Sequence, residues 1–157
     1  MKTNAVRLLE GLGVPIRIRE YPVDEAHMDA VSVAGLLGVE PERVFKTLVT
    51  VAADGTHRVF CIPGPLELDL AGAAAAAGVK SVRMLPLKQL QPLTGYVHGG
   101  CSPFGMKSAF PVIIDETVEL FETVFVSGGR RGLQIEIASE VLIELLDAKL
   151  ADVTRAA

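Results

Sequence analysis

Lys46 is the residue of this sequence with the clearest potential for chemistry, because it interrupts the apolar segment Val44–Val51. In a strand, Lys46 would share one face with Val44 and Leu48, and the opposite face is also largely apolar. An ammonium group is costly between two covered faces. Two interpretations stay open. Lys46 either lies at a strand edge and extends into solvent, or points inward with a lowered pKa and can hold a carbonyl oxygen or a phosphate.

A glycine-rich segment, Gly95–Gly105, could form one wall of a binding site. It contains the pair Gly99–Gly100 shortly before Ser102–Pro103. Paired glycines let the backbone approach a ligand closely and point amides into a concavity. Such segments are also typical of ordinary tight turns, so this feature alone does not identify a site.

A second glycine-rich segment, Val126–Gly132, joins two predicted strands. Gly128–Gly129 suits a hairpin turn with positive φ angles. Ser127 could then be a hydrogen-bonding wall residue, with Arg130–Arg131 as a small basic patch near an entrance. A plain surface turn with solvated arginines explains the same residues.

The cysteine and histidine pattern argues against a metal site and gives little support to a thiol nucleophile. Cys61 and Cys101 are too few and too far apart for a disulfide scaffold or a zinc site, and the three histidines show no ligand spacing. His98 and Cys101 lie three residues apart, whereas a catalytic Cys–His pair usually meets through the fold. We therefore expect no metal and no cofactor, and a small buried thiol at Cys101.

The charge and hydropathy of the chain restrict its partners. A formal net charge of -4 and a pI near 5.4 disfavour a general nucleic-acid binder, although the terminus of a nucleic acid could still enter a pocket. No apolar stretch reaches the roughly 18 residues that span a bilayer, and Arg7 and Glu10 interrupt the region where a signal peptide would be apolar. We expect a cytosolic protein without a membrane partner.

Apolar periodicity and turn residues predict the elements that would position these side chains. Helices are expected from Thr3 to about Leu12, between Asp29 and Gly38, over Leu70–Ala77 after Asp69, over the single turn Leu87–Leu90, and from Ser139 onward. Strands are expected at Pro15–Tyr21, Val44–Val51, Arg58–Ile62, Val79–Leu85, Phe110–Ile114, Thr123–Val126 and Leu133–Ala138, and Tyr96–Gly105 is expected to be a loop.

The same periodicity predicts which helix faces are buried, and Thr3, Asp29, Asp69 and Ser139 are the expected N-caps. The inward residues are expected to be Val6, Leu8, Leu9 and Leu12 in the first helix, Val33, Leu36 and Leu37 in the second, and Val141, Leu142, Leu145 and Leu146 in the last. Strands outnumber helices and do not alternate with them as β-α-β units. We therefore predict one α+β domain over residues 1–157, with a mixed or antiparallel sheet and helices packed outside.

Taken together, three motifs resemble those of the YbaK/EbsC family in their residues, their order and their spacing. The resemblance covers essentially the whole chain. The motifs are Phe45-Lys46-Thr47-Leu48, the segment from Gly95 through Gly99-Gly100-Cys101-Ser102-Pro103-Phe104-Gly105, and Val126–Leu133. The resemblance implies a barrel-like mixed β-sheet surrounded by helices. It also implies a trans-acting aminoacyl-tRNA deacylase, similar to the editing domain of bacterial prolyl-tRNA synthetases, that removes cysteine from tRNA(Pro) and also from tRNA(Cys).

The resemblance also assigns candidate site residues. Lys46 matches the essential lysine of the family. Substrate-binding positions are Tyr21, Thr47, Gly99, Gly100, Cys101, Ser102, Pro103, Ser127 and Gly128. The sequence departs from the family at Gln134, where some members carry an aspartate, and this leaves the preferred amino acid open.

In the mechanism that the resemblance implies, the thiolate of the substrate cysteine attacks its own carbonyl, so no protein nucleophile is needed. The acceptor end of an aminoacyl-tRNA is the expected partner, with prolyl-tRNA synthetase as a second one. Alternatives are editing of alanine or serine, a non-catalytic module that binds a nucleotide or aminoacyl-adenylate, and a thiol hydrolase that uses Cys101 and His98.

Overall fold

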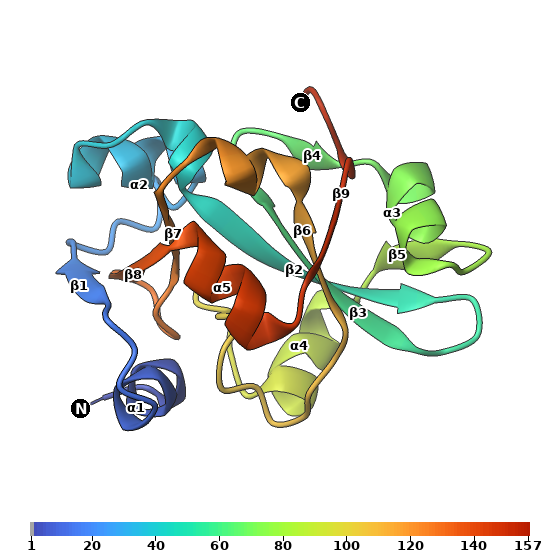
Figure 1. Cartoon of the computed structure of the whole chain (residues 1–157), viewed down its shortest axis with the longest axis horizontal. Coiled ribbons are helices and arrows are strands. Elements are labelled where there is room, and N and C mark those ends of the chain that lie inside the picture. The colour runs from blue at the N-terminus through green and yellow to red at the C-terminus, as the bar shows by residue number, and fades with distance from the viewer. Residues whose placement is uncertain (1) are drawn as a thin grey trace.

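The computed structural model describes residues 2–157, which fold into helices packed around a group of small sheets (Figure 1). The helices are α1 (Asn4–Gly11), α2 (Ala30–Leu37), α3 (Leu70–Ala77), α4 (Leu87–Thr94) and α5 (Ser139–Leu146), with 3-10 turns η1 (Pro41–Arg43) and η2 (Glu116–Leu120). The strands are β1 (Arg17–Glu20), β2 (Phe45–Ala52), β3 (His57–Pro63), β4 (Glu67–Leu68), β5 (Val82–Met84), β6 (Val112–Asp115), β7 (Thr123–Ser127), β8 (Leu133–Ala138), β9 (Lys149–Ala151) and β10 (Thr154–Arg155).

The strands form three sheets with mixed pairing. The largest has the order β5-β2-β3-β6-β9, in which β3-β6 and β6-β9 are parallel. A second has the antiparallel order β1-β8-β7, and β10 pairs with β4. The α+β class and the mixed sheet are confirmed, but no closed barrel forms among residues 2–157, because only the isolated parallel bridge Val44–Phe125 joins β2 to β7.

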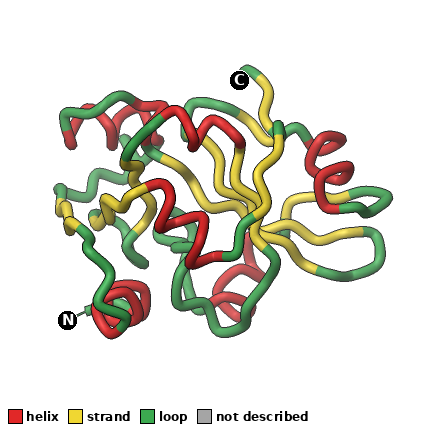
Figure 2. The backbone as a smooth tube through the Cα atoms, in the orientation of Figure 1, coloured by secondary structure: helices red, strands yellow, loops and turns green. Residues whose placement is uncertain are grey.

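Both faces of the largest sheet are covered, as the apolar strand pattern predicted. On one face Phe45 and Val49 pack with α1 and α5 in the main core. On the other face Phe60 and Ile62 pack with α3. Helix α2 covers the start of β2 and part of β7 in a third cluster. Figure 2 shows the helices distributed around the central strands in this way.

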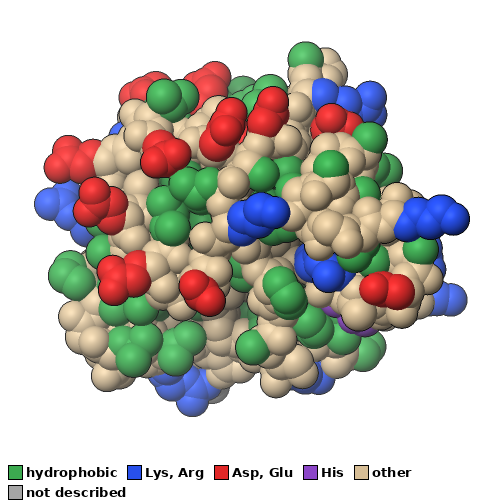
Figure 3. All heavy atoms as spheres, turned by 45° about the vertical axis from the view of Figure 1, so that its right-hand side comes forward, with side chains coloured by type: hydrophobic (Ala, Val, Ile, Leu, Met, Phe, Trp, Pro, Cys, Tyr) green, Lys and Arg blue, Asp and Glu red, His purple; other side chains and the backbone are tan. Residues whose placement is uncertain are grey.

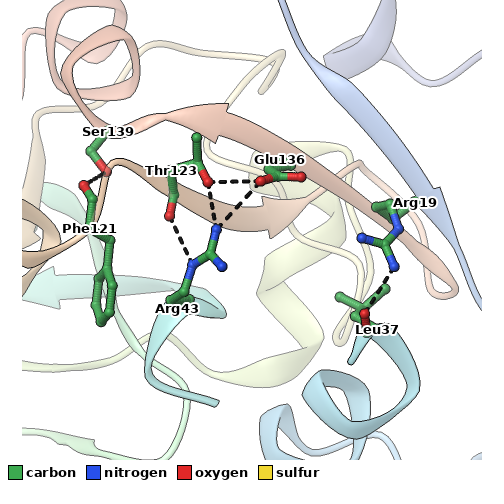
Figure 4. Close-up of polar contacts among 7 residues, drawn as sticks. All are labelled: Arg19, Leu37, Arg43, Phe121, Thr123, Glu136 and Ser139. Carbon is green, nitrogen blue, oxygen red and sulfur yellow. Dashed lines mark hydrogen bonds and ion pairs between the residues drawn. The ribbon is translucent and has the colours of Figure 1, made fainter. Parts of the chain in front are cut away.

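Arg43, just before β2, fastens this strand to the three-stranded sheet (Figure 4). Its Nε donates to the Thr123 carbonyl at 3.1 Å, and its terminal nitrogen lies 3.4 Å from the Glu136 carboxylate. Its guanidinium carbon lies 5.3 Å from the centroid of the Phe125 ring, a cation–π distance. Because Lys46 follows only three residues later, these contacts of Arg43 fix the position of Lys46 relative to β7 and β8.

Most helix starts agree with the sequence prediction, but two expected caps are wrong in detail. The Thr3 and Asp29 side chains accept backbone N–H groups at the starts of α1 and α2. Asp69 occupies the N-cap position of α3 without a side-chain cap bond. Ala138 is the N-cap of α5, because the Ser139 hydroxyl donates instead to the Phe121 carbonyl at 2.7 Å.

Four leucines expected to point inward are exposed. Leu8, Leu12, Leu36 and Leu145 lie on the solvent side, while alanines such as Ala5 and Ala34 take the most buried positions. In α1 and α2 the buried face includes these alanines beside Leu9 and Leu37, so the other leucines of the two helices lie outside it.

Several segment boundaries also differ from the prediction. Helix α4 continues to Thr94 through Pro92, because the Thr94 hydroxyl donates to the Leu90 carbonyl at 2.7 Å and closes the last turn. The strand expected at Val79–Leu85 is limited to β5. Strands β4, β9 and β10 have two or three residues and are too short to show a period of two.

Replacing Asp115 by alanine should lower the free energy of unfolding by about 3 kcal/mol, because one buried donor and two partly buried donors lose their acceptor. Asp115 is 1% exposed, and its two oxygens accept from Val153 N at 3.1 Å, Thr117 N at 3.3 Å and Thr117 Oγ1 at 2.6 Å. Urea denaturation measures the loss. Asp152→Ala, at an exposed neighbouring carboxylate, should change stability by less than about 0.5 kcal/mol. Equal losses would show that Asp115 does not hold the C-terminal segment.

Candidate functional site

An open cavity of about 730 Å³ lies between the start of β2, the β7–β8 pair and helix α2. Its volume suits a small-molecule ligand or the tip of a larger one. Six of the residues proposed from the sequence line it: Tyr21, Lys46, Thr47, Gly99, Cys101 and Ser127. The fold thus brings residues from all three motifs to one cavity.

Lys46 is half-buried in the wall of this cavity rather than extended into bulk solvent. Burial lowers the pKa of its ammonium group, and the negative charge of Glu67 opposes part of that shift. No carboxylate of residues 2–157 lies within 4.0 Å of Lys46 Nζ, since none of the ion pairs in this range includes it. The cavity therefore offers a partly desolvated cation that can bind an anionic group.

Thr47 lies on an open stretch of the β2 edge. Ala52 N donates to the Thr56 carbonyl across the β2–β3 hairpin, so the even-numbered residues of β2 form the main-chain hydrogen bonds to β3. The main-chain N–H and C=O groups of the odd-numbered residues point the other way, and there the Val49 carbonyl accepts from Leu85 N. On that side β5 pairs only with residues 50–52, and the bridge to β7 lies at Val44. The main chain of Thr47 therefore faces the gap between β5 and β7, where the cavity lies.

The two glycine segments pack tightly against each other beside the cavity. A Cβ atom built on Gly100 would lie 2.9 Å from the Arg130 Cα atom and 3.0 Å from its carbonyl carbon. Arg131 Nε donates to the His98 carbonyl at 3.0 Å and its NH1 lies 3.4 Å from Glu25. Arg131 therefore ties both segments together at the cavity wall.

Four residues proposed from the sequence, Gly100, Ser102, Pro103 and Gly128, are buried but do not line the cavity. The Ser102 hydroxyl accepts from Phe104 N at 3.2 Å, and the Gly128 carbonyl accepts from Thr3 Oγ1 at 2.5 Å. These residues shape the loops behind the wall. In the hairpin, Gly129 and Gly132 have positive φ angles, whereas Gly128 does not.

The wall formed by α2 and the segment before it was not predicted from the sequence. The missed lining residues are Glu25, Met28, Asp29, Ala30, Val33, Gly64, Leu90 and His98, with His98 considered only as a partner for Cys101. At Gly64 a side chain would overlap Ala30, with a Cβ–Cβ distance of 1.9 Å, but this contact becomes visible only in the folded structure. In the sequence, Asp29 predicts only the N-cap of a helix.

Cys101 and His98 do not form a nucleophilic pair. Burial raises the pKa of the Cys101 thiol to about 11, so almost none of it is thiolate near neutral pH. The His98 side chain is exposed, and its carbonyl rather than its ring contacts Arg131. In addition, no group of three or more His, Cys, Asp or Glu side chains within residues 2–157 is arranged to hold a metal ion.

Cys101→Ser should retain the deacylation that the motif resemblance implies, within about twofold of wild type, because the buried, protonated thiol only contributes to the wall. Steady-state assays on an aminoacyl-tRNA check this expectation. Inactivation of Cys101→Ser together with normal unfolding would support the thiol-hydrolase alternative instead.

Comparison with known proteins identifies the family. A sequence model for the aminoacyl-tRNA editing domain matches residues 24–145, which include the three motifs and every lining residue of the cavity except Tyr21. The chain belongs to the aminoacyl-tRNA editing domain family. This membership confirms the family that the motifs predicted, and with it the enzyme class of aminoacyl-tRNA deacylases.

Two relatives and a crystal structure are similar to this chain over most of its length. The "Putative Cys-tRNA(Pro)/Cys-tRNA(Cys) deacylase EbsC" of Enterococcus faecalis is 46% identical over 153 residues, covering 98% of this chain and 93% of the relative. The protein YwhH of Bacillus subtilis is 29% identical over 136 residues, covering 84% and 85%. A crystal structure described as a "putative trans-editing enzyme for prolyl tRNA synthetase" superimposes with a TM-score of 0.86 at 26% identity, covering 99% of each chain.

Proposed function

We propose that this protein is a trans-acting deacylase that removes cysteine from mischarged tRNA(Pro), with Cys-tRNA(Cys) as a second substrate. The observation that carries the proposal is the half-buried Lys46 ammonium in a cavity that has no thiolate of its own. The name of the Enterococcus faecalis relative supports the choice of cysteine.

In this proposal Lys46 binds the phosphate of the terminal nucleotide. An ammonium group holds a phosphate as a point charge, and the partly desolvated wall strengthens the attraction. Thr47 and Ser127 contact the rest of the acceptor end, and the backbone around Cys101 lies against the carbonyl side of the ester. Binding energy at the phosphate then orients the ester for reaction.

The proposed chemistry uses the side chain of the substrate. The cysteine thiolate attacks its own ester carbonyl, a C–S bond forms, the C–O bond to the ribose breaks, and the ribose oxygen takes up a proton. The released β-thiolactone opens in water to give cysteine. An aminoacyl ester is already activated, so orientation and charge stabilisation can carry most of the rate acceleration.

A cavity of this size contacts the acceptor end and few other phosphates, which agrees with the formal net charge of -4. Figure 3 shows acidic and basic side chains interspersed over one face of the molecule, without a continuous basic surface there. We therefore propose that prolyl-tRNA synthetase helps to select the tRNA, in the cytoplasm where tRNA is charged. No helix within residues 2–157 has the length and apolar character needed to cross a bilayer.

Purified protein tested on tRNA(Pro) charged with cysteine, serine, alanine or proline checks the substrate assignment. Cysteine and serine differ only in sulfur against oxygen, so rapid loss of cysteine with little loss of serine supports both the substrate and the thiol mechanism. Loss of alanine or serine at the same rate would favour a general small-residue editing site. Tight binding without loss of any ester would favour the non-catalytic module.

A further inference from the structure

Gln134, near the start of β8, presents a buried hydrogen-bond acceptor that the protein does not satisfy. The residue is 7% exposed, lines the cavity, and lies opposite Ser127 of β7 in the strand register. Its Oε1 atom has no hydrogen-bond partner among residues 2–157. A buried acceptor without a donor costs free energy, and folded proteins rarely retain one without a functional or structural reason.

The position of Gln134 in the cavity indicates which part of a substrate it meets. Ser127 and Gln134 are buried, whereas Lys46 is half-buried and the Glu25 side chain that pairs with Arg131 is largely exposed. If the terminal phosphate binds at Lys46, as the proposed function states, the aminoacyl group extends farther in. Gln134 then lies near the end of the substrate that carries the amino acid.

Three other side-chain acceptors of the cavity wall already have partners. Glu25 lies 3.4 Å from Arg131, and the Asp29 carboxylate accepts from Ser32 N and Ser32 Oγ. The Ser127 hydroxyl accepts from Gly129 N at 3.2 Å. The donor that an aminoacyl group brings to this depth is its α-amino group, and Gln134 Oε1 is the buried side-chain acceptor that lacks a partner within residues 2–157.

We propose that Gln134 is a specificity-determining residue whose Oε1 accepts an N–H from the α-amino group of the aminoacyl ester. The inference rests on the proposed function, because it takes an aminoacyl ester as the ligand. A neutral amide binds the amine without adding a carboxylate that would compete with phosphate for Lys46. The enzyme therefore requires a free α-amino group and discriminates against esters that lack it.

A comparison of two esters of tRNA(Pro) tests this inference: cysteinyl, and 3-mercaptopropionyl, which lacks only the amino group and keeps the thiol. Wild type should prefer the cysteinyl ester by about 10- to 100-fold in kcat/KM, the range expected for a hydrogen bond to a charged donor. Gln134→Leu should reduce this preference to about threefold or less by slowing only the cysteinyl reaction. Gln134→Glu, which keeps an acceptor at similar reach, should retain the preference.

Turnover of the 3-mercaptopropionyl ester by Gln134→Leu reports whether this variant is folded. A preference that stays unchanged in Gln134→Leu, or an equal loss on both esters, would overturn the inference. If wild type cleaves neither ester, the proposed function fails instead. Calorimetry then tests the role of Gln134 separately, with two analogues of adenosine 5′-phosphate that carry a cysteinyl or a 3-mercaptopropionyl group as a 3′-amide. A preference for the cysteinyl analogue that wild type shows and Gln134→Leu loses supports the inference, and an equal preference in both proteins overturns it.

Discussion

Lys46→Ala should reduce kcat/KM for deacylation by about 100-fold or more, because truncating one partner of a buried charged contact typically costs 2–5 kcal/mol. The ammonium group lies in the cavity wall without an acidic partner within 4.0 Å among residues 2–157, so its charge is available to substrate. Single-turnover and steady-state assays on charged tRNA measure the loss.

The stability of Lys46 variants separates a catalytic loss from a folding defect. Burial lowers the pKa of Lys46, so the folded protein holds the charged form at a cost in free energy. Lys46→Met should therefore be at least as stable as wild type, although it is inactive. Lys80→Ala, at an exposed lysine, is the matched control and should keep full activity. Activity of Lys46→Ala within a few-fold of wild type would remove the basis of the proposed function.

Gly100→Ala should lower kcat/KM by at least tenfold, although Gly100 does not line the cavity. A Cβ atom there would lie 2.9 to 3.1 Å from three backbone atoms of Arg130 and Arg131, which cannot move as a flexible side chain would. The two glycine segments must separate, and this shifts Gly99 and Cys101 in the wall. A displacement of about 1 Å in a positioned site can cost up to 100-fold in rate.

Gly35 in α2 provides a matched control for the effect of the Gly100→Ala substitution on activity. A Cβ atom on Gly35 meets no atom within 4 Å, so Gly35→Ala should keep activity and raise stability by about 0.5–1 kcal/mol. If Gly100→Ala were fully active, the close packing of the two segments would not be required for the site.

The sequence could predict those parts of the site that depend on local pattern. Lys46 stands out because a single charge interrupts an apolar strand, and the glycine segments stand out by composition. The contribution of α2 could not be read in this way, because Met28 and Val33 look like ordinary loop and helix residues until α2 packs against β2. The same holds for Gln134, whose unsatisfied oxygen depends on what surrounds it in three dimensions.

The fold was predictable at the level of class and of the longer strands, but not in its closure. The β2–β3 hairpin follows from two apolar runs around an Asp–Gly turn. The join between the sheets depends instead on the Val44–Phe125 bridge and on Arg43, which contacts Thr123 and Glu136, 80 and 93 residues away in the chain. Contacts of this range leave no periodic signal, so the sequence could not distinguish a closed barrel from separate sheets.

Titration of the Lys46 side chain by NMR, with and without substrate analogue, tests the central claim most directly. In the free protein its pKa should lie below the ordinary value of 10.5 because of burial. Binding of a 3′-cysteinylamide analogue of adenosine 5′-phosphate should raise this pKa, since a bound phosphate favours the charged form, and the analogue without the phosphate should raise it much less. A pKa of Lys46 that stays unchanged when the phosphorylated analogue saturates the protein would contradict the account.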